Sequence, residues 1–188
     1  MRHDHVVLGY HGCDAAVAER LLAGEPFRRS ENTYDWLGSG VYFWEYGIER
    51  AARFAGDQQQ RGKVTRPAVV GAVVQLGHCF DLLDTWATRD LTDGYRDYRS
   101  MLAQTGAMLP RNTGKTPDRE LRRLDCSVLN YYLRTLDSIG TVFDTVRCGF
   151  VEGAPVFLGS GIAEKSHIQI AVRNPACILG VFRPIVQP

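Results

Sequence analysis

Two short segments carry most of the information in this sequence: Tyr10-His11-Gly12 and Gly38-Ser39-Gly40-Val41-Tyr42-Phe43. The first closes an apolar, β-branched run over residues 6–10, which predicts a buried strand. The second leads from a glycine-rich turn into a short strand over residues 41–44. Each pattern is common by itself. The two segments, in this order and at this spacing, are followed by a third segment near the C-terminus. Chance is a poor explanation for the occurrence of all three in one chain.

The third segment is a Gly/Pro-rich loop followed by a strand: Glu152-Gly153-Ala154-Pro155-Val156-Phe157-Leu158-Gly159-Ser160-Gly161-Ile162, then Ser166-His167-Ile168-Gln169-Ile170-Ala171-Val172. Together the three segments resemble the NAD-binding half of ADP-ribosyltransferases, in the branch of poly(ADP-ribose) polymerases and diphtheria toxin. In those polymerases a comparable loop precedes a strand that begins with the catalytic glutamate. The alignment puts Gln169 at that position. The resemblance covers about residues 6–57 and 141–183 and leaves the middle of the chain uncovered.

Strand patterns at both ends and helical patterns in the middle predict an α+β fold rather than a doubly wound parallel sheet. The resemblance implies split, antiparallel-rich β-sheets with flanking helices, NAD in the cleft between them, and a helical insertion over residues 84–138. We therefore expect one ADP-ribosyltransferase-like catalytic domain over residues 1–188. The expected strands cover residues 6–10, 41–44, 68–74, 141–150, 167–173 and 178–182, and the expected helices 14–23, 50–55, 84–104 and a stretch that starts at Pro117.

The composition is typical of a globular protein, and the sequence also bears on the cellular compartment of the protein. Hydrophobic residues make up 45% of the chain, charged residues 23%, and the formal net charge is +1. No apolar run is long enough to span a membrane, and the N-terminus does not lead into a signal-peptide core. We therefore expect a cytoplasmic protein without a membrane partner. The five cysteines lack a C-x-x-C motif, which favours free thiols and no metal site: Cys13, Cys79, Cys126, Cys148 and Cys177.

The resemblance assigns NAD-binding roles to five residues. It implies that His11 hydrogen-bonds a ribose hydroxyl of NAD, the co-substrate. Gly12 lacks a Cβ atom and lets its backbone approach the nicotinamide carboxamide closely. Tyr42 stacks on the nicotinamide ring, and Phe54 closes the other side of that ring. Arg50 stands near the place of a serine that usually bonds the carboxamide; either the backbone of Gly12 suffices, or Arg50 faces the pyrophosphate.

Gln169 joins His11 and Tyr42 as a candidate catalytic residue, with one chemical difference from the family. Its amide can orient the 2′-hydroxyl of the reacting ribose, but it cannot accept a proton. General-base assistance is typically worth 10²–10⁴-fold, so we expect a single transfer rather than chain elongation. Either the nucleophile needs no prior deprotonation or another carboxylate serves. The candidate carboxylates are Glu152, Glu164 and Glu45.

Each of these residues also has an ordinary structural interpretation. A lone histidine such as His11 is more often a hydrogen-bonded core residue than a ligand contact. Tyr42 fits a strand aromatic, and Gln169 fits a polar residue on an alternating strand. The Gly38-x-Gly40 pair fits a tight turn and does not match the Rossmann fingerprint. The three segments taken together favour the NAD interpretation.

The middle of the chain bears on which kind of macromolecule would accept the ADP-ribose. Its basic residues outnumber its acidic ones, and tyrosines are interleaved, which suits single-stranded RNA or DNA. A solvated helical face with ion pairs explains the same pattern. The basic residues are Arg89, Arg96, Arg99, Arg111, Lys115, Arg119, Arg122, Arg123 and Arg134.

The sequence therefore predicts an NAD-dependent mono-ADP-ribosyltransferase acting on a macromolecule, with nucleic acid narrowly favoured as acceptor over protein. A free-standing catalytic domain resembles toxin or phage-defence effectors, which implies a neutralising antitoxin protein as a partner. The alternatives are a protein-targeting transferase, an NAD glycohydrolase that uses water as acceptor, and a catalytically inactive NAD- or ADP-ribose-binding module.

Overall fold

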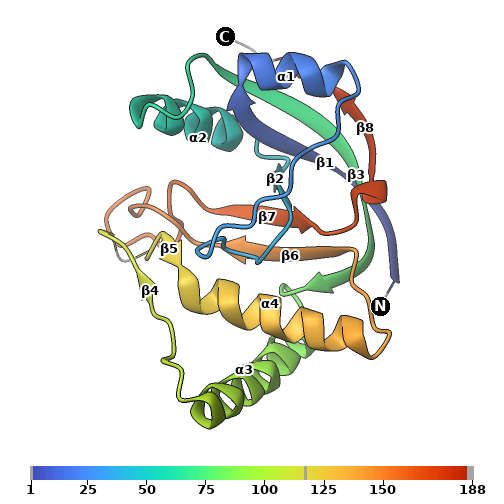
Figure 1. Ribbon diagram of the computed structural model, residues 1–188. Coiled ribbons are helices and arrows are strands. Elements are labelled where there is room, and N and C mark those ends of the chain that lie inside the picture. Colours follow the sequence, from blue (N-terminus) through green and yellow to red (C-terminus); the bar gives the residue numbers. More distant parts are fainter. Residues whose placement is uncertain (1, 117, 186–188) are drawn as a thin grey trace.

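The computed structural model describes residues 2–116 and 118–185 and has an α+β fold (Figure 1). Within these residues, four α-helices accompany a mixed six-stranded sheet and a small hairpin. The elements are β1 (Arg2–Asp14), α1 (Ala15–Leu22), β2 (Val41–Glu45), α2 (Ile48–Gln60), β3 (Pro67–Asp81), α3 (Thr85–Thr105), β4 (Asn112–Thr113), β5 (Leu121–Arg122), α4 (Arg123–Ser138), β6 (Thr145–Phe150), β7 (His167–Val172), the 3₁₀ turn η1 (Pro175–Cys177) and β8 (Ile178–Phe182).

The long strand β3 gives the sheet its shape. Most of its length pairs with β1, while its last three residues, 79–81, pair in parallel with β6. The other pairings of this sheet in the described residues are antiparallel. As a result, β1, β2, β7, β6 and β3 follow one another in a closed ring, with β8 added at the free edge of β3.

The ring has two halves, which Figure 1 shows one above the other. We call β1, β3 and β8 the β3 half, and β2, β7 and β6 the β7 half. Helices α1 and α2 cover the β3 half, and α3 and α4 lie beneath the β7 half. An apolar core that includes Val7, Phe43, Val74 and Ile170 fills the ring. A second core around Phe80 and Leu129 joins the β7 half to α3 and α4.

The local signals at α1 are confirmed in detail. The carboxylate of Asp14 accepts a hydrogen bond from the backbone N–H of Ala16 at 2.9 Å and so caps the first turn. The chain leaves the helix at Gly24, whose φ of 98° is a conformation that glycine adopts without strain. The helix therefore occupies the predicted stretch.

Two predicted helix boundaries were wrong. Helix α2 does not end near Gly56 but continues to Gln60, because nothing lies close to Gly56 and a single glycine costs only about 1 kcal/mol. The last helix, predicted from Pro117, begins at Arg123 because Leu121 and Arg122 pair with β4. The side chain of Asn112 accepts hydrogen bonds from the first helical N–H groups there. Pro117 itself lies outside the described residues.

The strands also extend beyond the predicted runs. β1 continues to Asp14 and β3 to Asp81, whereas β6 starts at Thr145 rather than residue 141. His11 and Gly12 therefore lie inside β1, next to α2. This extension positions both residues beside a cavity.

Candidate functional site

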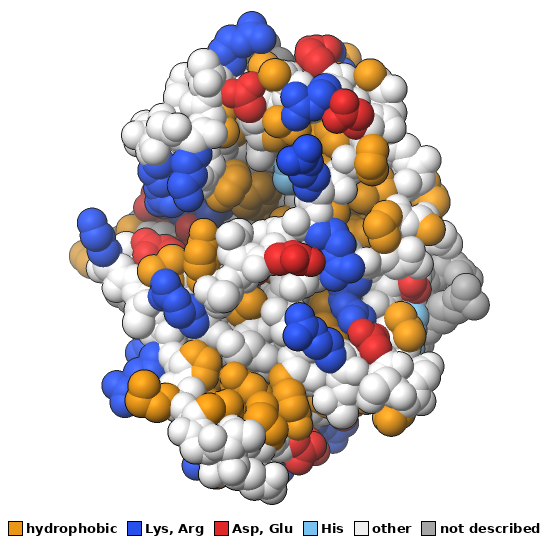
Figure 2. Space-filling model, in the orientation of Figure 1, with side chains coloured by type: hydrophobic (Ala, Val, Ile, Leu, Met, Phe, Trp, Pro, Cys, Tyr) orange, Lys and Arg blue, Asp and Glu red, His pale blue; other side chains and the backbone are white. Residues whose placement is uncertain are grey.

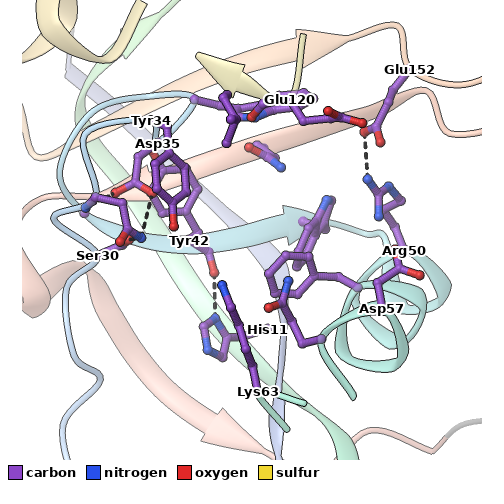
Figure 3. A pocket seen from close by; sticks show the side chains of 18 of the residues that line it. His11, Ser30, Tyr34, Asp35, Tyr42, Arg50, Asp57, Lys63, Glu120 and Glu152 are labelled. Atoms are coloured by element: carbon purple, nitrogen blue, oxygen red, sulfur yellow. Dashed lines mark hydrogen bonds and ion pairs between the residues drawn. The ribbon is translucent and has the colours of Figure 1, made fainter. Parts of the chain in front are cut away.

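A cavity of about 440 Å³ opens between α2, the β7 half and the loop before β2. Figure 2 shows this region as a shaded recess with Lys and Arg side chains along its rim. In Figure 3, Tyr34, Asp35 and Tyr42 lie on one side, Arg50 and Glu152 on the other. The lining residues are His11, Arg28, Ser30, Asn32, Tyr34, Asp35, Trp36, Gly40, Tyr42, Trp44, Arg50, Phe54, Asp57, Gln58, Arg61, Lys63, Glu120, Leu121, Glu152 and Gln169.

The cavity lies where β1 and β2 separate. Their pairing ends with Tyr10 and Trp44, and the carbonyl of Leu8 accepts a hydrogen bond from Tyr46. Because successive backbone groups of a strand point to alternate sides, the N–H and C=O of Gly12 face the gap that β2 leaves. Gly12 therefore presents backbone donors and acceptors on the cavity side of β1, although it is not one of the lining residues.

Gly12 is also a steric requirement. A Cβ atom there would lie 2.2 Å from the backbone carbonyl oxygen of Ala51 and 3.3 Å from the Cβ of Ala55. Both residues belong to α2, so the absence of a side chain at Gly12 lets α2 pack directly on β1. The same helix carries Arg50 and Phe54 into the cavity.

His11 bridges the two strands at the point where their ladder ends. Its Nδ1 lies 2.8 Å from the carbonyl oxygen of Tyr42 (Figure 3). A carbonyl only accepts, so Nδ1 carries the proton and Nε2 offers a lone pair when the ring is neutral. Burial lowers the pKa of His11, which keeps the ring neutral near pH 7. His11 can therefore accept a hydrogen bond from a hydroxyl.

Tyr42 contributes its ring to the cavity and its hydroxyl to the loop before β2. The hydroxyl donates to the carbonyl of Gly38 at 2.6 Å and accepts from the N–H of Leu37 at 2.8 Å. Burial raises the pKa of Tyr42 well above its ordinary value, and the nearby Asp35 carboxylate acts in the same direction. The neutral phenol thus fixes both its own ring and the turn at Gly38, where φ is 75°.

Phe54 and Arg50 enter the cavity from α2, one turn apart. Phe54 packs on Trp44 with ring centroids 5.0 Å apart, and the Arg50 guanidinium lies 5.5 Å from the centre of the same indole. Arg50 is ion-paired with Glu152 at 2.7 Å. Sequence reasoning missed Trp44 as a site residue. Its signal was present, because Trp44 is two residues beyond Tyr42 and therefore on the same face of the strand.

Gln169 lies on β7 directly opposite Trp44 and is only 8% exposed. Within the described residues, its side-chain oxygen is buried and has no hydrogen-bond partner. An unsatisfied buried acceptor costs about 1–3 kcal/mol, so this oxygen calls for a donor from outside the protein. Four further buried side-chain atoms in the same region have no hydrogen-bond partner among the described residues: Trp44 Nε1, Arg50 Nε, Arg122 Nε and His167 Nε2.

The three candidate carboxylates have different surroundings. Glu152 lines the cavity and is 8% exposed. Glu164 is exposed on the loop, where its carboxylate accepts a hydrogen bond from the N–H of Ala154. Glu45 is held by two hydrogen bonds from Arg147, at 2.6 and 2.9 Å, and neither residue lines the cavity. Only Glu152 among the three lies in the cavity wall.

The segment over residues 84–138, expected from the sequence to be a helical insertion and called the insertion below, supplies part of the same wall through Glu120 and Leu121. The indole N–H of Trp36 donates to the carbonyl of Glu120 at 3.0 Å. The guanidinium of Arg122 lies 4.0 Å from the Trp36 ring and 4.9 Å from that of Phe150. The insertion is therefore joined to the loop before β2 and encloses the cavity on that side.

Three of the basic residues of the insertion already contact neighbouring side chains. Arg96 pairs with Asp93 and Arg122 with Asp125, both within one turn of chain, as expected for ion pairs on helical faces. Arg99 lies over the ring of Tyr95. At the cavity itself, cationic side chains come from other segments: Arg28, Arg50, Arg61 and Lys63.

We expect the buried histidines to make stability fall in mild acid. Burial lowers the pKa of both His11 and His167. In the unfolded chain, histidine has a pKa near 6.5, so below that pH the unfolded state binds more protons than the folded state. The free energy of unfolding therefore decreases as pH falls below about 6.5. Urea unfolding at about pH 7.5 and pH 5.5 measures this loss. His11→Asn and His167→Asn should each reduce it, and an unchanged pH dependence in the double variant would contradict the assignment.

All five cysteines are free thiols. Over residues 2–116 and 118–185, no three His, Cys, Asp or Glu side chains gather in a way that would hold a metal ion. In the same part of the chain, every helix is too short or too polar to cross a bilayer. Comparison of the chain with protein-family models, with curated proteins and with solved structures gives no match.

Proposed function

We propose that this protein is an NAD-dependent mono-ADP-ribosyltransferase that modifies a macromolecule. The observation that carries the proposal is the convergence of His11, Tyr42, Phe54 and Gln169, from four separate segments, on one cavity. The unpartnered oxygen of Gln169 adds a polar contact that a bound ligand would satisfy. The two-halved sheet with its helical insertion is consistent with one catalytic domain of the ADP-ribosyltransferase type.

In the proposed complex, the nicotinamide ring lies against Tyr42 and Phe54. The backbone N–H and C=O of Gly12 bind the carboxamide, and Nε2 of neutral His11 accepts a hydrogen bond from a ribose hydroxyl. Gln169 binds the 2′-hydroxyl of the ribose that reacts. The C1′–N bond then breaks, nicotinamide leaves with the bonding electrons, and an acceptor nucleophile attacks C1′. The protein contributes position and exclusion of water rather than covalent chemistry.

We propose nucleic acid as the acceptor, on the strength of the cations at the cavity rim, Arg28, Arg61 and Lys63. Phosphate groups of single-stranded RNA or DNA are the natural partners of such a rim. The free thiols fit a reducing, cytoplasmic setting. The cell that makes an effector that consumes NAD in the cytoplasm must keep that activity inhibited. We therefore propose a neutralising antitoxin protein as a second partner.

The test is incubation with labelled NAD and separate RNA, DNA and protein pools. We expect label on nucleic acid, released nicotinamide in equal amount, and loss of both with His11→Ala. Label confined to protein would identify a protein-targeting transferase. Nicotinamide release that is undiminished without any macromolecule would identify an NAD glycohydrolase. Calorimetric NAD binding without release would identify an inactive NAD- or ADP-ribose-binding module.

A further inference from the structure

We infer that Glu152, held by Arg50, is the carboxylate that orients the acceptor and takes its proton. This inference rests on the proposed function, and it concerns a step that Gln169 cannot perform. An amide neither carries the negative charge nor accepts the proton that an incoming nucleophile releases. A different group in the same cavity must therefore supply that step.

The other carboxylates of the cavity wall are less suited to the task. Asp35 already accepts hydrogen bonds from the backbone and side chain of Asn32. Glu120 accepts a hydrogen bond from the hydroxyl of Thr116, and Asp57 is exposed on α2. Glu152 is the buried one among these four, so water screens its charge least.

Glu152 also lies close to the position where the reaction would occur. One of its carboxylate oxygens is 3.7 Å from Nδ1 of His167. His167 and Gln169 are two residues apart on β7, so their side chains share one face of the sheet. The Glu152 carboxylate therefore lies next to His167, which is the neighbour on this face of Gln169, the residue whose amide we propose binds the reacting ribose.

Arg50 fixes this arrangement. Its guanidinium binds Glu152 at 2.7 Å and packs over Trp44, the cross-strand neighbour of Gln169. The ion pair gives the buried Glu152 carboxylate a cationic partner and leaves its second oxygen for another donor. Arg50 is therefore a positioning residue, which accounts for a cation at this place in α2.

In the proposed step, the C1′–N bond of NAD breaks, and its electron pair neutralises the pyridinium as nicotinamide leaves. The acceptor atom donates a lone pair to C1′ and forms the new bond. Bond formation makes the proton on that atom acidic, and the Glu152 carboxylate takes it. A weak base suffices because the proton moves only as the new bond forms.

The experiment compares Glu152→Gln with Glu164→Gln, an exposed glutamate of the same loop. Wild-type and variant proteins receive labelled NAD and a total RNA pool, with a cell-protein pool as the second arm. For Glu152→Gln we expect a NAD dissociation constant within about threefold of wild type and a transfer kcat at least about 10²-fold lower. Glu164→Gln should transfer within about threefold of wild type. Glu152→Asp, which keeps the charge, should recover part of the lost kcat.

Thermal unfolding shows whether each variant is folded. Glu152→Gln leaves Arg50 without its anion. If that variant does not fold, the double variant Arg50→Gln/Glu152→Gln, which removes both charges, takes its place; a folded double variant with a wild-type transfer kcat would contradict the inference. Retention of wild-type transfer by folded Glu152→Gln would overturn it, as would loss of NAD binding alone. Failure of the proposed function has a separate signature, since the wild-type protein itself would neither bind NAD nor release nicotinamide, and the inference would fall with it.

Discussion

Replacement of Tyr42 by alanine is expected to weaken NAD binding by roughly 30- to 1000-fold. The ring forms part of the cavity wall, and a ligand stacked on it would gain about 0.5–1.5 kcal/mol beyond burial. Loss of the apolar contact itself adds about 1.5–3 kcal/mol. The sum, about 2–4.5 kcal/mol, corresponds to roughly that range at about 1.4 kcal/mol per decade. Isothermal titration calorimetry with NAD measures it directly.

Two further variants separate the ring of Tyr42 from its hydroxyl. Tyr42→Phe keeps the ring but removes the hydrogen bonds to Leu37 and Gly38, so it should lower stability while NAD affinity changes by less than about fivefold. Tyr46→Ala, at an exposed residue of the following turn, should leave NAD affinity unchanged. If folded Tyr42→Ala binds NAD as tightly as wild type, the nicotinamide does not stack on Tyr42.

Substitution of Gly12 by alanine is expected to lower the free energy of unfolding by about 2–3 kcal/mol. The new Cβ would lie 2.2 Å from the Ala51 carbonyl oxygen, a backbone atom that moves only if the whole of α2 shifts. That shift would also displace Arg50 and Phe54 from the cavity. For a chain of this length the melting temperature should fall by roughly 4–12 °C, which calorimetry or circular dichroism would record.

Gly56→Ala is the matched control for Gly12→Ala. Gly56 lies inside α2, and a Cβ atom added there would have no neighbouring atom within 4 Å, so alanine meets open space. The better helix propensity of alanine should raise stability by about 0.5–1 kcal/mol. If Gly12→Ala matched this gain, α2 would not pack on β1 as closely as the structure shows.

The fold class and most element positions could be predicted because local signals were strong. Asp14 and Gly24 delimit α1, and Ile178–Phe182 was predicted to the residue. The start of α4 could not be predicted, because it depends on Asn112, a residue of the preceding hairpin strand that becomes a cap only through tertiary contact. The continuation of helix α2 through Gly56 likewise depends on the surroundings of that residue and not on the glycine itself.

The site was predicted in part, for a similar reason. His11, Tyr42, Phe54, Arg50 and Gln169 were identified from segments whose patterns are local, and all five line the cavity. The ion pair between Arg50 and Glu152 joins residues 102 positions apart, and the contact from Trp36 to Glu120 spans 84. Neither has a sequence signature. Long-range contacts of this kind decide which of several carboxylates enters the cavity.

The closed ring of strands has a consequence for synthesis on the ribosome. β7 lies between β2 and β6 and carries Gln169, a residue of the cavity wall. This part of the wall is therefore missing until residues 167–172 have left the exit tunnel. Pairings between such distant segments form late in folding. Nascent or prematurely terminated chains that lack β7 should therefore lack a complete pocket.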